Sequence, residues 1–308
     1  MQCIKKLTEY HGERRSAVTF GKFDGLHEGH QLLIQKVREL GIKENLNSIV
    51  CAFDMHDVWR DRGVKPQVLM TRYERHLHLE NVVDNLVTCP FTWEFSRMEP
   101  EDFIKNIICG LFKAKYVVVG PDFSFGKDKG GDTAMLEKYS TVYDYQLIVI
   151  EKKRYEDRVI SSSYIREALR EGKVSTVNTM LGYPFEISGT VMHGRQLGRK
   201  LGFPTLNVMW PKAKVVPPMG VYMADVYLDG KKYHSVANIG VKPTVTDENK
   251  VSIESFLFDY DGDAYDKDVR IELLEFRRHE QKFDSVEIMK EHVDKDIAYA
   301  KEYFGIKE

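Results

Sequence analysis

The stretch Thr19-Phe-Gly-Lys-Phe-Asp-Gly-Leu-His-Glu-Gly-His30 decides the fold of the first half of the chain. It begins within a short apolar run, Ala17–Phe20, that is typical of a buried strand. After it, apolar residues recur at helical spacing from Leu32 to Leu40, and Gly41 is expected to end the helix. The sequence therefore predicts a strand, a glycine-rich turn and a helix.

The two histidines of this stretch, His27 and His30, stand at the predicted helix N-terminus. Unpaired backbone N–H groups and the positive end of the helix dipole favour an anion there and disfavour a charged imidazolium. Gly25 and Gly29 let the backbone approach a ligand closely. The pattern predicts a nucleotide-phosphate site with neutral imidazole N–H donors.

The rest of the first half alternates between two patterns. Short runs rich in β-branched residues are typical of buried strands, and apolar residues recur between them at helical spacing. This alternation predicts a parallel sheet covered by helices, with ligands at the carboxyl ends of the strands. The expected strands are Ala17–Phe20, Ser48–Phe53, Asn85–Thr88, Tyr116–Val119 and Gln146–Ile150, and the expected helices are His30–Leu40, Arg72–Val82, Pro100–Leu111 and Thr133–Tyr143.

The second half has a different sequence pattern. After an expected helix at Ser163–Glu171, strand patterns and Gly/Pro turns dominate to about residue 275, which predicts a closed antiparallel barrel or a sandwich. An amphipathic helix, Ser285–Tyr303, should pack on it. We expect two domains, 1–182 and 183–308. The expected strands are Phe185–Val191, Val221–Leu228, Tyr233–Ile239, Val251–Phe258 and Val269–Glu275.

Composition narrows the class of partner. The chain has 308 residues, 43% of them apolar and 30% charged, with a formal net charge of −2. Interspersed charges of both signs argue against nucleic-acid and membrane-surface partners, so small molecules are expected. No apolar run is long enough for a membrane span or a signal peptide, which predicts a cytoplasmic protein. The four scattered cysteines suggest reduced structural thiols. Nothing in the sequence indicates an oligomeric state.

Two more motifs in the first half suit the same ligand. Gly120-Pro-Asp-Phe-Ser-Phe-Gly126 follows a predicted strand, and Ile160-Ser-Ser-Ser-Tyr-Ile-Arg166 opens a helix with hydroxyls and an arginine, which suits β- and γ-phosphates. Taken singly, a surface turn, an N-capped helix and a core histidine explain the three motifs as well. Their occurrence in this order at strand ends favours the nucleotide site.

The second half contains Pro204-Thr-Leu-Asn207, where a hydroxyl and an amide oxygen lie on one side of an extended segment. Such hard oxygen ligands suit Mg²⁺ held mainly by substrate phosphates. Glu254 lies in an alternating strand, on the face opposite Ile253 and Ser255, and could accept a proton. A glycine-rich hairpin and an exposed strand carboxylate remain the alternatives.

Together the motifs resemble the bacterial bifunctional riboflavin kinase/FMN adenylyltransferase (FAD synthetase) family, whose first domain is an HxGH nucleotidyltransferase. The resemblance spans nearly the whole chain and implies a Rossmann-like domain followed by a riboflavin kinase barrel with a C-terminal helix. The matching residues are Gly21, Phe23, Asp24, Gly25, His27, Gly29 and His30, then Gly120, Asp122, Phe123, Phe125 and Gly126, then Ser162, Ser163, Ile165 and Arg166, with Gly194–Asn207, Gly220–Tyr222, Asn238–Thr244, Ile253–Glu254 and Arg278–Glu280 in the second half.

The resemblance implies that the chain phosphorylates riboflavin to FMN with ATP and then adenylylates FMN to FAD, releasing pyrophosphate. It implies catalytic roles for Glu254, as base toward the riboflavin 5′-hydroxyl, and for His27, His30 and Arg166. The implied ligand contacts are nucleotide at Gly21, Phe23, Asp24, Gly29, Ser162, Ser163, Gly198, Thr205 and Asn207, flavin at Asp122, Phe123, Phe125 and Arg278, and Mg²⁺ with ATP phosphates at Thr205 and Asn207.

The sequence departs from the family pattern at Pro121, where an aromatic residue is common, at Ser163, where a threonine is common, and in two further places. Lys22 replaces an asparagine, and Phe53-Asp-Met-His-Asp-Val58 replaces a segment of the Pro-His-Pro type. These departures leave open a monofunctional riboflavin kinase with a weakened adenylyltransferase domain. A flavin- or nucleotide-binding regulatory protein is a further alternative, although such a protein would not need a base at Glu254.

Overall fold

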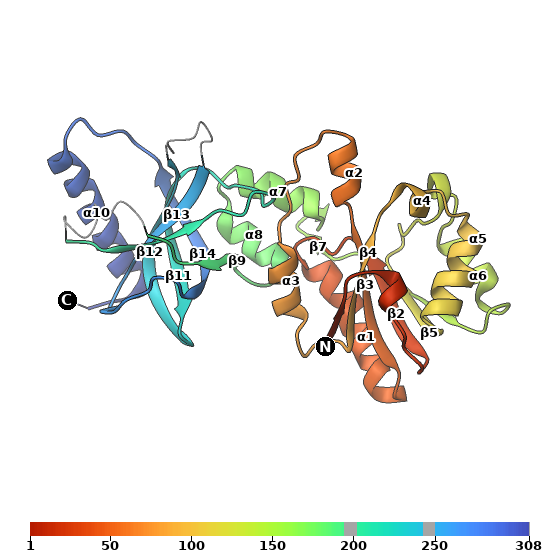
Figure 1. Ribbon diagram of the computed structural model, residues 1–308. Helices are drawn as coiled ribbons and strands as arrows, with labels where there is room; N and C mark the ends of the chain where they lie inside the picture. Colours follow the sequence, from red (N-terminus) through yellow and green to blue (C-terminus); the bar gives the residue numbers. More distant parts are fainter. Residues whose placement is uncertain (194–201, 243–249, 308) are drawn as a thin grey trace. The chain divides into compact units, whose positions relative to one another are not determined.

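The computed structural model describes residues 1–193, 202–242 and 250–307 (Figure 1). The chain divides into two compact units, Met1–Ser162 and Ser163–Glu308. Each unit has its own sheet and its own core, and each is described by itself below.

The first unit is built on a six-stranded sheet in which every pair of neighbouring strands is parallel. The strand order is β1-β4-β3-β2-β5-β6, so the chain reverses its direction of winding between β2 and β5. Ligands of such sheets bind at the carboxyl ends of the strands beside this switch point. The strands are β1 (Gln2–Ile4), β2 (Ser16–Gly21), β3 (Asn47–Asp54), β4 (Asn85–Pro90), β5 (Ala114–Val119) and β6 (Gln146–Val149).

Helices cover both faces of this sheet (Figure 1). α1 (Glu28–Glu44) packs against β2, β3 and β5 through Leu33, Ile34, Val37 and Leu40. On the other face, Ile104 and Ile108 of the π-helical segment η2 (Phe103–Leu111) join Val18 and Phe20 of β2 in a core cluster. The remaining elements of this unit are η1 (Leu7–Glu9), α2 (His56–Asp61), α3 (Arg72–Leu79), α4 (Trp93–Ser96), α5 (Pro100–Asp102), η3 (Lys127–Lys129), α6 (Thr133–Ser140), β7 (Arg154–Tyr155) and β8 (Arg158–Val159).

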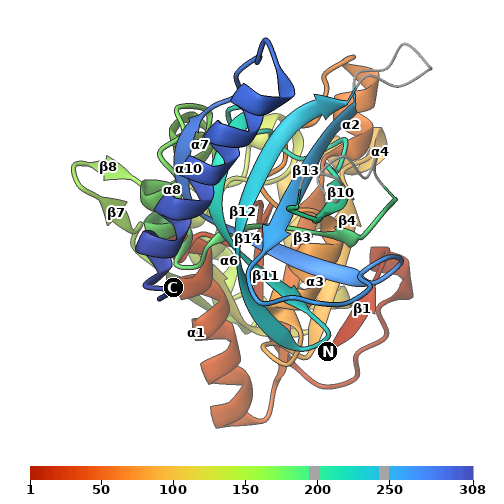
Figure 2. The ribbon, with the colours of Figure 1, turned by 90° about the vertical axis from the view of Figure 1, so that its left-hand side faces the viewer.

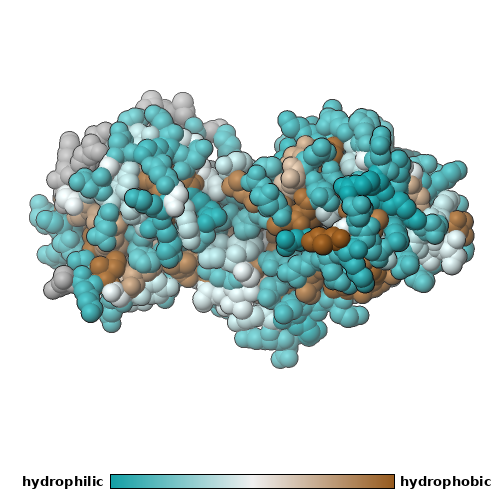
Figure 3. Space-filling view, turned by 90° about the horizontal axis from the view of Figure 1, so that it is seen from below, coloured by the Kyte–Doolittle hydropathy of each residue, from teal (hydrophilic) through white to brown (hydrophobic). Residues whose placement is uncertain are grey.

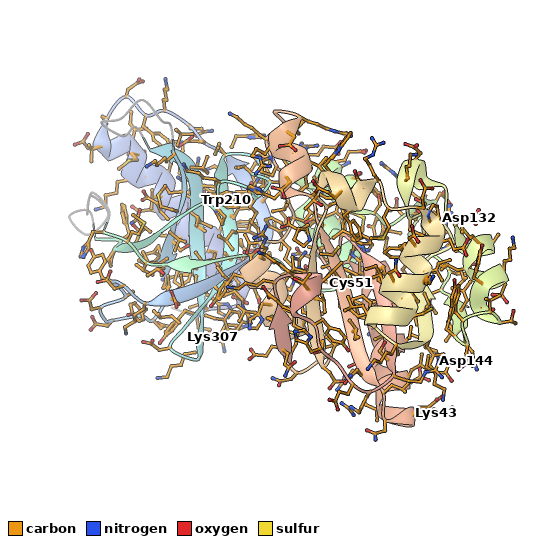
Figure 4. The ribbon with its side chains drawn as sticks, turned by 45° about the vertical axis from the view of Figure 1, so that its right-hand side comes forward. Lys43, Cys51, Asp132, Asp144, Trp210 and Lys307 are labelled. Carbon is orange, nitrogen blue, oxygen red and sulfur yellow. The ribbon has the colours of Figure 1, made fainter. Side chains whose placement is uncertain are left out.

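The two ends of the sheet are separated in space. Figure 4 shows Lys43 and Asp144, which precede β3 and β6, at the amino end of the strands, and Asp132, which follows β5, toward the other end. Arg15, just before β2, forms an ion pair with Asp144 at 2.8 Å. The glycine-rich turn after β2 therefore lies at the end where ligands of parallel sheets bind.

The second unit is a curled antiparallel sheet with the order β10-β13-β12-β11-β14-β9. Its two edge strands meet where the Met192 N–H donates to the Asn207 carbonyl at 2.8 Å, so the sheet closes into a barrel. A Cβ on Gly189 would lie 2.6 Å from Val208 Cγ1, so closure needs a residue without a side chain there. The strands are β9 (Phe185–Thr190), β10 (Thr205–Met209), β11 (Gly220–Leu228), β12 (Lys231–Lys242), β13 (Lys250–Leu257) and β14 (Asp268–His279).

Among the residues that the structure describes, helices α7, α8 and α10 complete this unit. α10 (Val286–Phe304) lies along the outside of the barrel beside β12 (Figures 1 and 2). Its Ala300 and Ile297 pack with Val221 and Met223 of β11. α7 (Ser162–Arg170) and α8 (Val174–Leu181) precede the barrel, and the amide of Asn178 in α8 donates to the Leu273 carbonyl at 2.9 Å.

The fold class expected from the sequence is confirmed: a helix-covered parallel sheet, then an antiparallel barrel with a C-terminal helix. Some local expectations were wrong. Gly41 lies inside α1, which continues until Asn45 adopts a left-handed conformation at φ 51°. α8 was not expected, because its apolar residues fall in a stretch that reads as a loop before Gly182 and Pro184. β1 and α2 were also missed.

Closure of the barrel gives a testable prediction. Gly189→Ala should destabilise the second unit by about 1–3 kcal/mol, because the added methyl overlaps Val208. Adding Val208→Ala should recover part of that loss, so the two substitutions are not additive. Urea unfolding followed by fluorescence of the buried Trp210, with Trp59 and Trp93 replaced by Phe, measures both effects. Additive losses would show that the contact does not limit closure.

Candidate functional site

The turn between β2 and α1 has an unusual backbone. Phe23, Gly25 and Leu26 all have positive φ, at 47°, 86° and 37°. Non-glycine residues rarely adopt this conformation, and where they do the surroundings must hold them there. The Gln31 side chain supplies one restraint, since its amide donates to the Leu26 carbonyl at 2.9 Å.

The two histidines of the turn are stacked. Their ring centroids lie 3.7 Å apart with an interplanar angle of 18°, and Phe23 packs on His30 with centroids 5.1 Å apart. A Cβ at Gly29 would lie 3.3 Å from the His27 ring, a tight contact that would require the ring to shift slightly. The sequence motif thus builds one compact pair of imidazoles at the N-terminus of α1.

His27 caps α1 and fixes its own tautomer. Its Nδ1 accepts from the His30 backbone N–H at 3.4 Å, so a neutral ring carries its proton on Nε2. The side chain of His30 is also enclosed, and its Nδ1 is buried without a hydrogen-bond partner in the described part of the chain. Buried polar atoms are nearly always paired, so this atom distinguishes His30 from His27, whose Nδ1 accepts a backbone hydrogen bond.

Burial keeps both rings uncharged. Desolvation lowers the pKa of His27 to about 4, and His27 is only 7% exposed. Desolvation, followed by the neighbouring His27, holds the pKa of His30 well below its usual value. At neutral pH the pair therefore offers N–H donors that keep their protons, which suits phosphate oxygens on which charge develops.

Asp24 and Ser162 hold the turn in place. The Asp24 carboxylate accepts from the backbone N–H groups of Leu69 at 2.8 Å and Met70 at 3.3 Å. The Ser162 hydroxyl donates to the Asp24 carbonyl at 2.8 Å. These contacts indicate positioning roles for both residues. They also bring the first and third motifs together at Ser162, whereas Ser163 and Arg166, which follow on α7, belong to the second unit.

Arg75 is a contributor that sequence analysis missed. Its guanidinium donates to the Lys22 carbonyl at 3.3 Å, and burial lowers its pKa while nearby Asp54 and Asp24 oppose that shift. Its position in α3 gave no signal, because the contact spans 53 residues. Lys22 itself is exposed, and its main chain rather than its side chain carries this contact.

The second motif lies where β5 ends. Asp122 is exposed and pairs with Lys152 at 2.6 Å. The Phe123 ring stacks on Phe20 and Phe125 with centroids 6.0 and 5.6 Å away. Phe125 is buried in the aromatic core and its backbone pairs with Gly131, so its ring packs there, while flavin contact by Phe125 stays a prediction. Gly21 and Gly120, at the ends of β2 and β5, flank the switch point of the sheet.

In the second unit, strand register places three predicted or candidate polar residues in one row. Asn207 of β10 lies directly opposite Glu254 of β13, and Glu254 lies directly opposite Asn238 of β12. Directly opposed residues in antiparallel strands share a face, with Cβ atoms roughly 5 Å apart. The row lies on the face that packs against α10, because Val221, the next residue along it, contacts that helix.

Thr205 lies two residues before Asn207 on β10, so both side chains point to the same face, as expected. Asn207 is nearly buried and its amide nitrogen donates to the Thr205 carbonyl at 3.5 Å. A hydroxyl and an amide oxygen are donors that suit Mg²⁺. Among the described residues, no group of three His, Cys, Asp or Glu side chains could hold a metal ion. Gly198 lies outside the described residues.

Arg278 is held by a partner that sequence analysis missed. Its Nε and Nη2 both donate to the Asp296 carboxylate of α10, at 3.1 and 2.6 Å. Asp296 is 4% exposed, so this bidentate pair ties β14 to α10 where water is largely excluded. Two polar residues facing inward from a helix and a strand 18 residues apart leave no local pattern in the sequence.

Family comparisons match the two units separately. The FAD synthetase family model matches residues 10–164, and the riboflavin kinase family model matches residues 181–304. Named relatives match almost the whole chain. The bifunctional riboflavin kinase/FMN adenylyltransferases of Bacillus subtilis and Escherichia coli are 35% and 34% identical over 95% and 94% of this chain, covering 94% and 93% of those proteins.

A solved structure extends the likeness to three dimensions. It aligns with a TM-score of 0.85 at 29% identity over 97% of this chain and 98% of that one, and it is described as a macrolide-efflux protein from Streptococcus pneumoniae.

No helix in the described part of this chain is long and apolar enough to cross a membrane. Figure 3 shows hydrophilic side chains over most of the face it presents.

One family model matches most of each sheet-bearing part of the chain, and the relatives align with nearly all of it. The chain belongs to the bifunctional riboflavin kinase/FMN adenylyltransferase family.

Proposed function

We propose that this chain makes FAD in two ATP-dependent steps, with the kinase site at the Asn207–Glu254–Asn238 row and the adenylyltransferase site at the His27–His30 pair. The observation that carries this proposal is the buried, neutral histidine stack at the N-terminus of α1. The two activities occupy residues 1–182 and 183–308, a division supported by the separate family matches.

In the kinase step, the 5′-hydroxyl oxygen of riboflavin forms a bond to the γ-phosphorus of ATP, and ADP leaves. Glu254 takes the hydroxyl proton, while flavin contact falls to Arg278, whose guanidinium is fixed by Asp296. Phosphoryl transfer needs positioning and charge stabilisation more than covalent help from the protein. The Glu254 carboxylate, flanked by the amides of Asn207 and Asn238, meets the requirement for positioning.

Thr205 and Asn207 would hold Mg²⁺ together with the ATP phosphates, because their oxygens are on one face of β10 beside Glu254. The ion would neutralise phosphate charge during transfer. The two protein ligands alone make a weak site, which fits an ion that arrives with the nucleotide.

In the adenylyl step, a phosphate oxygen of FMN forms a bond to the α-phosphorus of ATP, and pyrophosphate leaves. His27 and His30 donate to phosphate oxygens as charge develops on them, and neither acts as a nucleophile. The main chain from Gly21 to Gly29 lies close to the nucleotide. For Ser163 and Arg166, contact with the leaving pyrophosphate is a prediction from the motif alone, as is flavin contact by Asp122 and Phe123.

The proposal predicts separable losses. With riboflavin, ATP and Mg²⁺, the intact chain should accumulate FAD, measured by chromatography of the flavins. His30→Ala should stop at FMN, with adenylylation slowed roughly 10²–10³-fold. Glu254→Gln should leave riboflavin unchanged, with phosphorylation slowed about 10²–10⁴-fold, but still convert supplied FMN to FAD.

Conversion of riboflavin to FMN alone by the intact chain would support the monofunctional alternative. Unchanged riboflavin would support the binding-protein alternative. Loss of both steps in either folded variant would contradict the assignment of two sites.

Burial of the neutral histidines also predicts how stability depends on pH. His27 has a pKa of about 4 in the folded chain and an ordinary value of 6.5 when unfolded, so acid protonates the unfolded state first. The free energy of unfolding should therefore fall as pH drops from 6.5 toward 4, by about 2 kcal/mol at pH 5 for His27 alone.

Urea unfolding of the wild-type chain and of His27→Gln at several pH values measures this contribution together with the smaller effect of His27 on the pKa of His30. The wild-type curve should be the steeper one between pH 6.5 and 4. Parallel curves would show that His27 is not held neutral.

A further inference from the structure

The polar row on the barrel contains a residue to which the family resemblance gives no role. Asn238 lies directly opposite Glu254, on the side away from Asn207. The three side chains lie on one face, so the Glu254 carboxylate has an amide on each side. Thr205 and Asn207 serve the nucleotide side of the proposed kinase site, which leaves Asn238 on the other.

The carboxylate of Glu280 also approaches this row, in the space left by the missing side chain of Gly240. A Cβ on Gly240 would lie 2.8 Å from Glu280 Oε1 and 3.3 Å from Asn238 Nδ2. Both atoms therefore sit over Gly240, which is two residues from Asn238 on the same face of β12. Glu280 follows β14, and its backbone N–H donates to the Met219 carbonyl at 3.0 Å, which fixes where its side chain begins.

We propose that Asn238 is a positioning residue for Glu254, and that Glu280, admitted by Gly240, holds the Asn238 amide in the orientation this requires. The inference rests on the proposed kinase site. It adds a second layer of polar groups on the side of the base opposite to the nucleotide ligands.

The chemistry of the three groups supports this arrangement. A side-chain amide has two N–H donors, so Asn238 can donate to a carboxylate on either side of it. Hydrogen bonds from a neutral donor favour the ionised form of a carboxylate, whereas a second carboxylate in contact disfavours it. Asn238 between Glu254 and Glu280 therefore separates two negative charges and holds the base in one orientation.

Gly240→Ala tests the arrangement by adding one methyl group and leaving the rest of the barrel unchanged. The new methyl meets only the end of the flexible Glu280 side chain and the Asn238 amide, so the barrel should keep its unfolding midpoint. The kcat for riboflavin phosphorylation should fall about 10–100-fold because the base is no longer oriented, while KM for ATP changes less than about twofold. Conversion of supplied FMN to FAD should be unchanged.

Gly262→Ala is the matched control. A Cβ there meets only the hydroxyl end of Tyr260 at 3.0 Å, and Gly262 lies outside the row. Its kcat should match that of the intact chain. Asn238→Ala should reproduce the loss seen with Gly240→Ala, and Glu280→Gln, which keeps an acceptor oxygen, should retain more activity than Glu280→Leu.

Failure of this inference can be told apart from failure of the proposed function. If Glu254→Gln abolishes phosphorylation while Asn238→Ala and Gly240→Ala stay within twofold of the intact chain, the positioning role is wrong and the kinase site stands. If Glu254→Gln leaves phosphorylation intact, the kinase site itself is wrong. If Gly240→Ala unfolds the barrel, Asn238→Ala decides the question.

Discussion

The enclosure of two imidazoles at the N-terminus of α1 is the constraint on which the first unit depends. Stacking of His27 on His30 is accompanied by close packing of Gly29 on the His27 ring, a strained turn through Phe23 and Leu26, and a helix that begins at Glu28. The backbone N–H of Leu69, the Gln31 amide and the Ser162 hydroxyl then restrain this turn through hydrogen bonds to Asp24 and Leu26. The result is a pair of uncharged donors beside the switch point of the sheet.

The second unit uses an antiparallel barrel to bring its site residues together. A barrel brings strands that are distant in sequence into register, so that Asn207, Glu254 and Asn238 form a row although Asn207 and Glu254 are 47 positions apart in the sequence. Closure at the Met192–Asn207 bridge fixes one end of this row, and the Arg278–Asp296 pair fixes α10 over the same face. Separate cores allow each unit to hold its own site geometry.

Local patterns explain what the sequence could predict. The strand-turn-helix at residues 17–40 was predictable because apolar periodicity, glycines and histidines lie within one short stretch. Its end was not, because Gly41 fits closely against Ser48 within the helix while Asn45 takes the left-handed position. The partnership of Arg278 with Asp296, the contact of Arg75 with Lys22 and the register of Asn238 with Glu254 all depend on long-range packing, which leaves no periodic signal. Phe125, expected at a flavin, lies in the aromatic core.

The central claim is that the two steps occur at two separate sites and that FMN made at one serves as substrate at the other. Mixing the His30→Ala chain with the Glu254→Gln chain, in riboflavin, ATP and Mg²⁺, tests it most directly. Neither variant alone should make FAD from riboflavin, but the mixture should make it after a lag in which free FMN accumulates. A mixture that makes FMN but no FAD, although the Glu254→Gln chain converts supplied FMN, would contradict the account.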